Sequence, residues 1–502
     1  MDNFVALRSE WLGKASSNSG VWPAMGVAIL GEFSGIQKFV LRPVPGAAGA
    51  ARRLRARSFR VLALTRLVAA AVEKRFSSAS ARLFYSAGGR FLVVMNSSVD
   101  WRDRLEILQR EIDIDLVNQF HGELAFHLAG AQFEDGRIPT TDLVHSMASR
   151  KVNPLAGCLI GAKGWNTGSF SRASIVNGKC EGCASTDFLK NDGGANLCQT
   201  CIDDQSLGKV LQQGAPVYLA NSIEGYLQLL GESWKASQSG AYAVPLVTHS
   251  PLENRQTATF EQLAKRSKGR SYLAYLRIDA DRVGNAFRSL DSDPAKTRAL
   301  SAILDQAFSS EVSVLISTKF PNIYPVYGGG DDLFVIGPWN DILDFALGWR
   351  TEFRGICGDQ LTFSAGVVLS KPRQHILSKS EEAEHALNVN AKRCRDSIHA
   401  LGTTLTWNEF EIALQGAKEL ARFHADGAIK SAMLQNVIEL HARWKTGDNR
   451  WHSLLFYQVQ RNMSGQAKDF VFNAFLRPGN LWKFADFAVR YAMLSASAKE
   501  GD

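Results

Sequence analysis

Three aspartates stand beside short apolar segments in the second half of the chain, where they could bind metal. Asp331 and Asp332 end a Gly-Gly-Asp-Asp turn that starts at Gly329, and Asp279 follows the apolar segment 273–278. If these segments are neighbouring strands of one sheet, three carboxylates converge at one edge. Hard oxygen ligands favour Mg²⁺ or Mn²⁺. Two such ions would activate an attacking hydroxyl and stabilise a leaving phosphate, which is the chemistry of phosphoryl transfer.

Gly-Gly-Asp-Asp is also an ordinary composition for a hairpin turn. The order of the surrounding elements favours a metal-binding turn. The elements follow one another as strand, two helices, two strands, helix and strand, which is the order of a ferredoxin-like palm. The predicted elements are a strand at 273–278, helices at 283–290 and 295–319, strands on both sides of the turn, a helix at 339–357 and a strand at 361–369. In such a palm, Gly329 and Gly330 would let the backbone approach a phosphate closely.

A further predicted helix, residues 380–395, carries Lys392. A lysine there is usually a solvated surface charge. In a palm domain it can reach a triphosphate.

Four of the seven cysteines form two CxxC pairs with 14 residues between them: Cys180, Cys183, Cys198 and Cys201. Two such pairs complete a tetrahedral zinc site. A redox role is the alternative, but two matched pairs make it the weaker reading. With four thiolate ligands the zinc has no open position, so we expect it to be structural.

The composition is that of a multi-domain globular protein. The chain has 502 residues, 45% hydrophobic residues and a formal net charge of +8, which weakly favours a polyanionic partner. It contains no run of 18 apolar residues and its N-terminus does not resemble a signal peptide, so we expect a cytoplasmic protein with no membrane partner.

The first half repeats the palm pattern in weaker form. Two predicted strands flank Gly88-Gly89 within residues 82–94, and Arg90 follows in the place of the first metal-binding acid. This unit therefore should not bind catalytic ions, although its glycine turn and basic residues could hold a nucleotide. The basic residues upstream of it are Arg52, Arg53, Arg55 and Arg57; the alternative for them is a solvated helix face.

These patterns predict an α+β protein with two ferredoxin-like palm domains, a zinc-binding module between them and a C-terminal helical bundle. The expected divisions are a flexible lead-in at 1–20, a degenerate first palm at 21–156, a zinc module and helical linker at 157–265, a catalytic second palm at 266–407 and a helical domain at 408–502. Within the linker we expect a helix at 222–235.

Together these features resemble the large polymerase-like subunit of type III CRISPR–Cas effector complexes. The resemblance rests on an ordered set of motifs from about residue 21 to the C-terminal bundle. They are Gly31-Glu-Phe-Ser-Gly-Ile-Gln37, Leu54-Arg-Ala-Arg-Ser-Phe59, the Gly88-Gly89 hairpin, the four cysteines, Asp279-Ala-Asp281, Gly329-Gly-Asp-Asp332 and Leu455-Phe-Tyr-Gln-Val-Gln-Arg461.

The resemblance implies synthesis of cyclic oligoadenylates from ATP, switched on when the complex captures target RNA. It implies partners, namely other effector subunits, guide RNA and target RNA. By the same resemblance Asp279, Asp331 and Asp332 bind the catalytic metal, and Lys392 contacts phosphate. Ser34 and Gly35 would form part of the opposing nucleotide pocket.

Many members of that family begin with an HD-type nuclease domain, whereas this sequence contains no His-Asp dipeptide. We therefore expect no HD-type cleavage of single-stranded DNA. Two other functions stay open. One is a nucleotide cyclase of the diguanylate cyclase type, whose turn normally ends in Glu-Phe. The other is a non-catalytic scaffold that holds RNA, which intact acids at 279, 331 and 332 argue against.

Overall fold

The computed structural model describes residues 23–42, 49–161, 164–165, 177–211, 217–244, 249–290, 293–359, 361–477 and 481–496. The predicted lead-in at residues 1–20 lies outside the described residues. The domain divisions given above stay a prediction, and the architecture is described here element by element.

The first sheet has four antiparallel strands in the order β2-β3-β1-β4. Its elements are β1 (Gly26–Ser34), α2 (Ile36–Val40), α3 (Ala50–Arg75), β2 (Arg82–Ala87), β3 (Arg90–Asn96), α4 (Trp101–Phe120), β4 (Ala125–Phe133) and α5 (Thr140–Val152). Apolar residues alternate along β1, so Val27 and Ile29 pack in one core with α3 and α4. Ala28 and Leu30 pack on the other face with residues of α5.

The second sheet repeats this plan and extends it. Its order is β18-β19-β17-β20-β21-β22. The elements are β17 (Leu273–Ala280), α9 (Val283–Ser289), α10 (Pro294–Gln306), α11 (Val312–Lys319), β18 (Tyr324–Gly329), β19 (Asp332–Pro338), α12 (Trp339–Cys357), β20 (Phe363–Ser370), α13 (Ile376–His385), α14 (Lys392–Cys394), β21 (Ser397–Ala400) and β22 (Thr403–Thr406). The predicted order of strands and helices around the Gly-Gly-Asp-Asp turn is therefore confirmed.

The internal repeat extends to the details of strand pairing. The order β2-β3-β1-β4 of the first sheet matches β18-β19-β17-β20 of the second. Both hairpins also shift register at the same step, between Leu83 and Tyr85 in one and between Pro325 and Tyr327 in the other. The two palms are thus two copies of one structural unit.

The described residues between the sheets form short strands and a few helices. A zinc-ribbon-like hairpin, β9 (Leu189–Asp192) and β10 (Ala195–Cys198), leads into α7 (Gln199–Val210). A four-stranded sheet follows, made of β11 (Val217–Asn221), β12 (Leu227–Leu229), β13 (Glu232–Ser237) and β14 (Tyr242–Val244). The helix predicted at 222–235 is wrong. Leu227, Leu229, Trp234 and Ala236 are buried at alternate positions, which is the period of a strand.

The C-terminal region is helical, as predicted. It comprises α15 (Trp407–Ala425), α16 (Ser431–Lys445), α17 (Arg450–Asn462), α18 (Gly465–Val471) and α19 (Ala485–Ser495). α18 was not predicted. The core of this region is continuous with that of the second sheet through Trp339, Trp407, Phe410 and Phe487.

One helical stretch, Pro294–Lys319, is long and apolar enough to cross a membrane by length and composition alone. Half of its most apolar window is buried inside the protein. Leu304, Phe308, Val312 and Ile316 from this stretch pack into the core of the second sheet. We therefore interpret it as a core helix.

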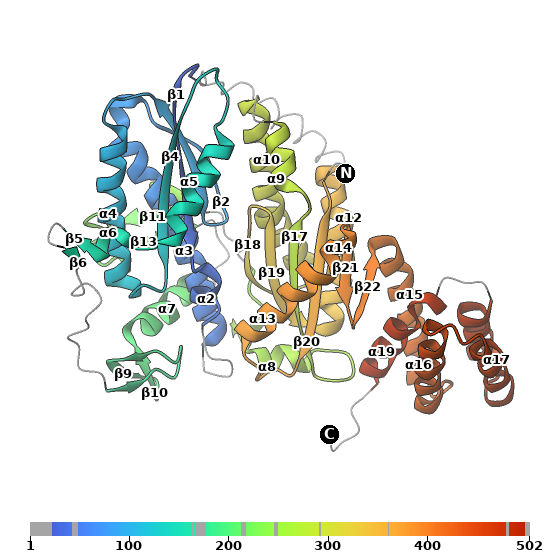
Figure 1. Cartoon of the computed structure of the whole chain (residues 1–502). Coiled ribbons are helices and arrows are strands. Elements are labelled where there is room, and N and C mark those ends of the chain that lie inside the picture. The colour runs from blue at the N-terminus through green and yellow to red at the C-terminus, as the bar shows by residue number, and fades with distance from the viewer. Residues whose placement is uncertain are drawn as a thin grey trace.

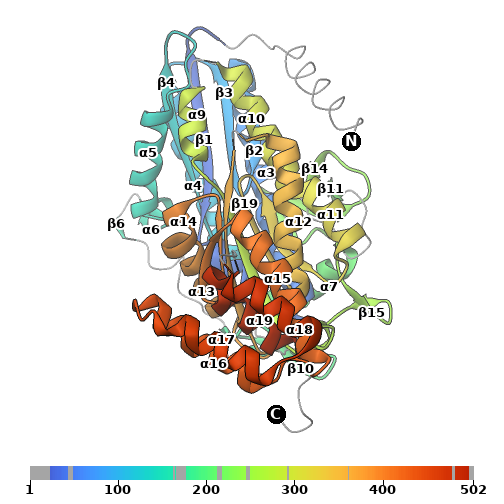
Figure 2. The same ribbon diagram turned by 90° about the vertical axis from the view of Figure 1, so that its right-hand side faces the viewer.

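Figure 1 shows the two sheets side by side, with the β9–β10 hairpin and α7 below the first sheet and the C-terminal helices beside the second. Figure 2, turned by 90°, shows α16, α17, α18 and α19 gathered at the lower end of the second sheet. The arrangement leaves the turn of each hairpin facing the other palm.

Candidate active site

The Gly-Gly-Asp-Asp turn joins β18 to β19 and brings two of the predicted acids together. In the antiparallel ladder Asp279 of β17 lies directly opposite Asp332 of β19, so the two side chains share one face of the sheet. Gly329 and Gly330 have φ values of 152° and 65°, which favour glycine. The turn therefore requires its glycines for conformational reasons as well as for any approach of a phosphate.

Burial shapes the electrostatics of the three acids. Burial raises the pKa of Asp332 to about 7, although the nearby Arg277 guanidinium lowers it. Burial also raises the pKa values of Asp279 and Asp331. Burial disfavours the charged carboxylate, and a nearby cation stabilises that charged form.

Asp332 is held by a residue that sequence reasoning missed. The Arg277 guanidinium is buried, lies 3.4 Å from Asp332 Oδ2 and pairs with Glu384 at 2.9 Å. The other carboxylate oxygen of Asp332, Oδ1, is buried and makes no hydrogen bond among the described residues. An orphaned carboxylate oxygen beside Asp279 fits the donor set that Mg²⁺ or Mn²⁺ requires. The signal in the sequence was an arginine between the apolar residues Leu276 and Ile278 of the strand Leu273–Ala280.

The acids are not clustered as tightly as a bound metal would draw them. In the part of the chain that the structure describes, only the four cysteines form a group of three or more ligand atoms within 4.8 Å of one another. Asp281 does not join the site. Its carboxylate accepts hydrogen bonds from Thr362 Oγ1 at 2.9 Å, Ser364 Oγ at 2.8 Å and the backbone N–H of Asp396 at 2.9 Å. It fixes the end of the sheet.

Lys392 lies at the site, with its ammonium in contact with Asp279 Oδ2. The structure thus places the lysine against an acid, where it offsets part of the carboxylate charge. Its predicted contact with phosphate stays a prediction.

The turn is supported by a second missed residue, Asp305 of α10. Its Oδ1 accepts a hydrogen bond of 3.1 Å from the backbone N–H of Gly330. Burial raises the pKa of Asp305 to about 6. The clue in the sequence was a lone acid between the apolar residues Leu304 and Ala307.

The first palm presents its own turn to this site. A Cβ placed on Gly88 would lie 3.4 Å from the carbonyl oxygen of Gly329, so the two glycine turns are in contact. A cavity of about 340 Å³ lies beside them, with Tyr85 and Arg90 of the first palm and Gly330 and Asp331 of the second among its lining residues. The positive charge of Arg90 lowers the pKa of Asp331, against the stronger raising by burial.

Strand register corrects the predicted alignment of the two turns. Ala87 pairs with Arg90 as Gly329 pairs with Asp332, so Arg90 occupies the position of the second acid. Aligning the two Gly-Gly pairs in the sequence had instead predicted that Arg90 takes the position of the first acid, Asp331. The hairpins instead align by their ladder ends, which places Gly89 where the second palm has Asp331.

The first palm also keeps a remnant of the acid–lysine pair. Glu32 lies opposite Arg90, as Asp279 lies opposite Asp332. Lys151 Nζ is 2.6 Å from Glu32 Oε1, which repeats the contact between Lys392 and Asp279. The degenerate palm has therefore lost its hairpin acids but not its strand acid.

Ser34 and Gly35 lie at the end of β1. Ser34 Oγ is 2.8 Å from His127 Nε2. Gly35 has φ 85° and packs against Glu123, whose carbonyl oxygen would be 2.6 Å from an added Cβ. Neither residue lines the cavity that contains Arg90 and Asp331, and their role in a nucleotide pocket stays a prediction.

The four cysteines come together as predicted, in a group that could hold a metal ion. They are buried, their sulfur atoms lie within 4.8 Å of one another, and Cys183 Sγ is 3.8 Å from Cys198 Sγ. Cys180 Sγ also accepts backbone N–H bonds from Gly182 at 3.3 Å and Cys198 at 3.2 Å. Four convergent thiolates stabilised by such N–H bonds fit zinc.

The basic segment before the first hairpin is not a solvated face. Arg53, Arg55 and Arg57 are 0–4% exposed. Arg57 Nε lies 2.8 Å from Asp204 Oδ2, and its Nη2 lies 3.7 Å from Cys201 Sγ. The solvated reading is therefore wrong for these three arginines: at least one of them joins the first palm to the zinc module.

Comparisons with known proteins agree with this architecture. Residues 272–399 match the family model of the Cas10/Cmr2 second palm domain, and residues 27–153 match that of Csm1 subunit domain B. A curated relative from Thermococcus onnurineus, a CRISPR system single-strand-specific deoxyribonuclease Cas10/Csm1 of subtype III-A, is 25% identical over 86% of this chain. A relative with the same description from Streptococcus thermophilus is 24% identical over 75%. The chain spans 64% and 53% of the lengths of these two relatives.

Solved structures share the fold. A Csm1–Csm4 cassette in complex with AMPPNP matches 97% of this chain and 73% of its own with a TM-score of 0.69 and 18% identity. The cassette in complex with cA3 matches 95% of this chain and 72% of its own, with a TM-score of 0.67 and 20% identity.

Proposed function

Because the chain belongs to the Cas10/Csm1 family of type III CRISPR proteins, we propose that it makes cyclic oligoadenylates from ATP between its two palms. The observation that carries the proposal is the facing pair of turns, which puts Arg90 of one palm and Asp331 of the other on a single cavity. A cation and an acid site across one cavity suit a reaction between two triphosphates.

Each residue then has a role that follows from its position. Asp279, Asp331 and Asp332 would hold Mg²⁺ or Mn²⁺, and the bound ion supplies activation of the attacking hydroxyl and neutralisation of the leaving phosphate. Arg277 orients the Asp332 carboxylate. Arg90 lines the same cavity, where its guanidinium would bind the triphosphate of the opposing nucleotide.

We further propose that the chain works with other Csm subunits, guide RNA and target RNA. Solved structures that resemble it include assemblies of Csm1 with Csm4, among them complexes with ATP and with cyclic oligoadenylates. A site shared by two domains is a natural control point, because a small shift between them misaligns the reactants. We expect synthesis to rise when target RNA binds the guide-loaded complex in the cytoplasm.

The test is product analysis after incubation of the complex with ATP or GTP, with matched, mismatched or no target RNA. Asp331→Ala with Asp332→Ala should leave no detectable product, since the metal ligands are gone, while assembly stays intact. Replacing two exposed acids, Asp359→Ala with Asp426→Ala, is the matched control and should have no effect. Undiminished synthesis by the first variant would refute the assignment.

The same assay separates the two other readings. A guanylate product made without RNA would indicate a cyclase of the diguanylate type. No product from either nucleotide under any condition would indicate a scaffold.

A further inference from the structure

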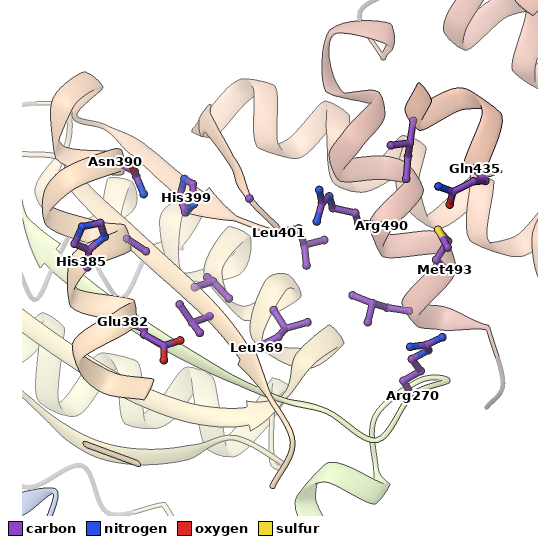
Figure 3. A pocket seen from close by; sticks show the side chains of 16 residues that line it. Arg270, Leu369, Glu382, His385, Asn390, His399, Leu401, Gln435, Arg490 and Met493 are labelled. Atoms are coloured by element: carbon purple, nitrogen blue, oxygen red, sulfur yellow. The ribbon is translucent and has the colours of Figure 1, made fainter. Parts of the chain in front are cut away.

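A second cavity, remote from the facing turns, lies between the second palm and the C-terminal helices. Its volume is about 770 Å³, within the usual range for small-ligand sites. One wall comes from β20, the α13 segment and the β21–β22 turn, and the other from α16 and α19 (Figure 3). We call it the palm–bundle cleft.

The floor of the palm–bundle cleft is apolar. It is formed by side chains such as Val367, Leu369, Leu401, Ile438 and Leu494. A floor of this kind accommodates a flat ring but offers it no hydrogen bonds.

Two arginines at the cleft carry uncompensated charge. Arg270 and Arg490 both line it, both are exposed, and neither guanidinium makes a hydrogen bond or ion pair with another described residue. The nearest acid of the lining, Glu382, is already bound by Lys379, whose Nζ lies 2.6 Å and 2.7 Å from its two carboxylate oxygens. Free guanidinium groups bind phosphate through paired N–H donors.

Neutral polar groups face the arginines across the floor. Figure 3 shows His385, Asn390 and His399 on one side of the cleft and Gln435 and Arg490 on the other. Burial lowers the pKa of His399, and the neighbouring His385 lowers it further, so both favour the neutral form of this imidazole. Amide and imidazole groups at the edge of an apolar slot are suited to the edge of a nucleobase.

We propose that the palm–bundle cleft binds a nucleoside phosphate, with its phosphate on Arg270 and Arg490 and its base over the apolar floor. A nucleoside phosphate combines the three features that the cleft recognises: an anion, a flat ring and hydrogen-bonding edges. The same chemistry is offered by a free nucleotide and by a nucleotide of single-stranded RNA, and the test below distinguishes them.

The position of the cleft connects it physically to the acids of the second palm. Asn390 lies in a π-helical segment, Ala386–Ala391, that runs directly into Lys392, and Lys392 contacts Asp279. Such π-helical turns occur frequently at functional sites. A ligand in the cleft therefore touches the segment that positions this lysine, although the binding proposal does not depend on catalysis.

The test is photolabelling of the full chain with 8-azido-ATP, followed by peptide mapping. We expect label in peptides from 367–402 or 481–496, separate from label at the cavity between the palms. Competition with AMP and with a single-stranded hexaadenylate RNA identifies the source: the competitor effective at lower concentration is the better mimic of the ligand.

Arg270→Ala with Arg490→Ala should weaken the cleft labelling about tenfold or more and leave the labelling between the palms unchanged. The matched control is Arg443→Ala with Arg461→Ala, which removes two arginines outside the cleft lining. Leu401→Trp is an independent variant that fills the floor, and it should give the same loss. Retained labelling between the palms verifies that each variant is folded.

Two results would overturn the proposal. One is label confined to the cavity between the palms in the wild-type chain. The other is cleft labelling that survives both the arginine variant and Leu401→Trp. Either result leaves the proposed synthesis untouched, because that depends on Asp331 and Asp332.

Discussion

Replacing Asp204 should release the zinc module from the first palm. Asp204 of α7 is fully buried and accepts hydrogen bonds of 2.8 Å from both Arg57 Nε and Arg60 Nε of α3. It lies one helical turn after the zinc-site residue Cys201. One carboxylate thus pairs with two buried guanidiniums and joins two elements that are 144 or more residues apart in the chain.

The magnitude follows from what Asp204→Ala leaves behind. Arg57 keeps its bond to the carbonyl oxygen of Phe39 at 3.0 Å, and Arg60 keeps its bond to that of Tyr226 at 2.8 Å. Neither carbonyl oxygen carries a full charge, and the other remaining contact of Arg57 is the 3.7 Å one from its Nη2 to Cys201 Sγ. Removing one partner of a buried ion pair costs about 3–5 kcal/mol, and we expect a loss in this range for the contact between α3 and α7.

Hydrogen exchange followed by mass spectrometry measures the loss of stability of α7 itself. Exchange of α7 amides (Gln199–Val210) should become about two orders of magnitude faster, or more, in Asp204→Ala. The matched control is Asp203→Ala on the same helix, because Asp203 is half-buried and bonds only to Gln199 among the described residues. That variant should change the exchange little.

Equal exchange rates of α7 in Asp204→Ala and Asp203→Ala would refute the reasoning. It would mean that the hydrophobic contacts of α3 with α7 hold the module without the ion pairs. Loss of zinc measured with a chelator should follow the same order, fastest in Asp204→Ala.

Other outcomes are expected elsewhere in the chain. Protein purified without added metal should contain one zinc per chain by elemental analysis, and a zinc-free, fully folded chain would contradict this. Burial raises the pKa of Asp113 to about 6, so the folded state binds its proton more tightly than the unfolded state, and this group lowers stability as pH rises from about 4 to 6. Asp113→Asn should therefore gain about 2 kcal/mol over wild type at pH 8 and little at pH 4 in urea unfolding; an equal gain at both values would exclude titration as the cause. Arg90→Ala should reduce product formation with ATP, whereas Arg90→Lys should restore part of it by supplying charge without the planar fork; identical rates in all three proteins would remove Arg90 from the site. The chain should not cleave single-stranded DNA with manganese, and cleavage that persists without Asp331 and Asp332 would reveal a second site.

Local sequence patterns were sufficient for the second palm from β17 to β20, although they did not predict β21 and β22. Apolar strands, glycine turns and amphipathic helices are local signals, and α12 was predicted with its observed bounds, Trp339–Cys357. The spacing of the cysteines similarly predicted a four-thiolate cluster, because a CxxC turn places two sulfur atoms together whatever surrounds it.

Patterns failed where a segment was short or its partner was distant. The helix predicted at 222–235 is wrong because the strands of the sheet at 217–244 are only three to six residues long and their alternation of buried residues is brief. The arginines of α3 were read as solvated or nucleotide-binding because the partner of Arg57 and Arg60, Asp204, is 144 or more residues away. Arg277 and Asp305 were also missed, because their partners Asp332, Glu384 and Gly330 lie 25 to 107 residues away in the chain.

The sequence by itself determined which residues could do chemistry: the acids at 279, 331 and 332, the four cysteines and the paired glycine turns. Only the tertiary structure decided which of them face one another. A hairpin's ladder can shift by one residue without any change in its composition, and each shift moves every side chain to the other face. Register therefore placed Arg90 opposite Glu32 and at the position of Asp332, and it aligned Asp279 with Asp332. Burial, which is a property of the whole fold, then determined the charge that each of these groups can carry.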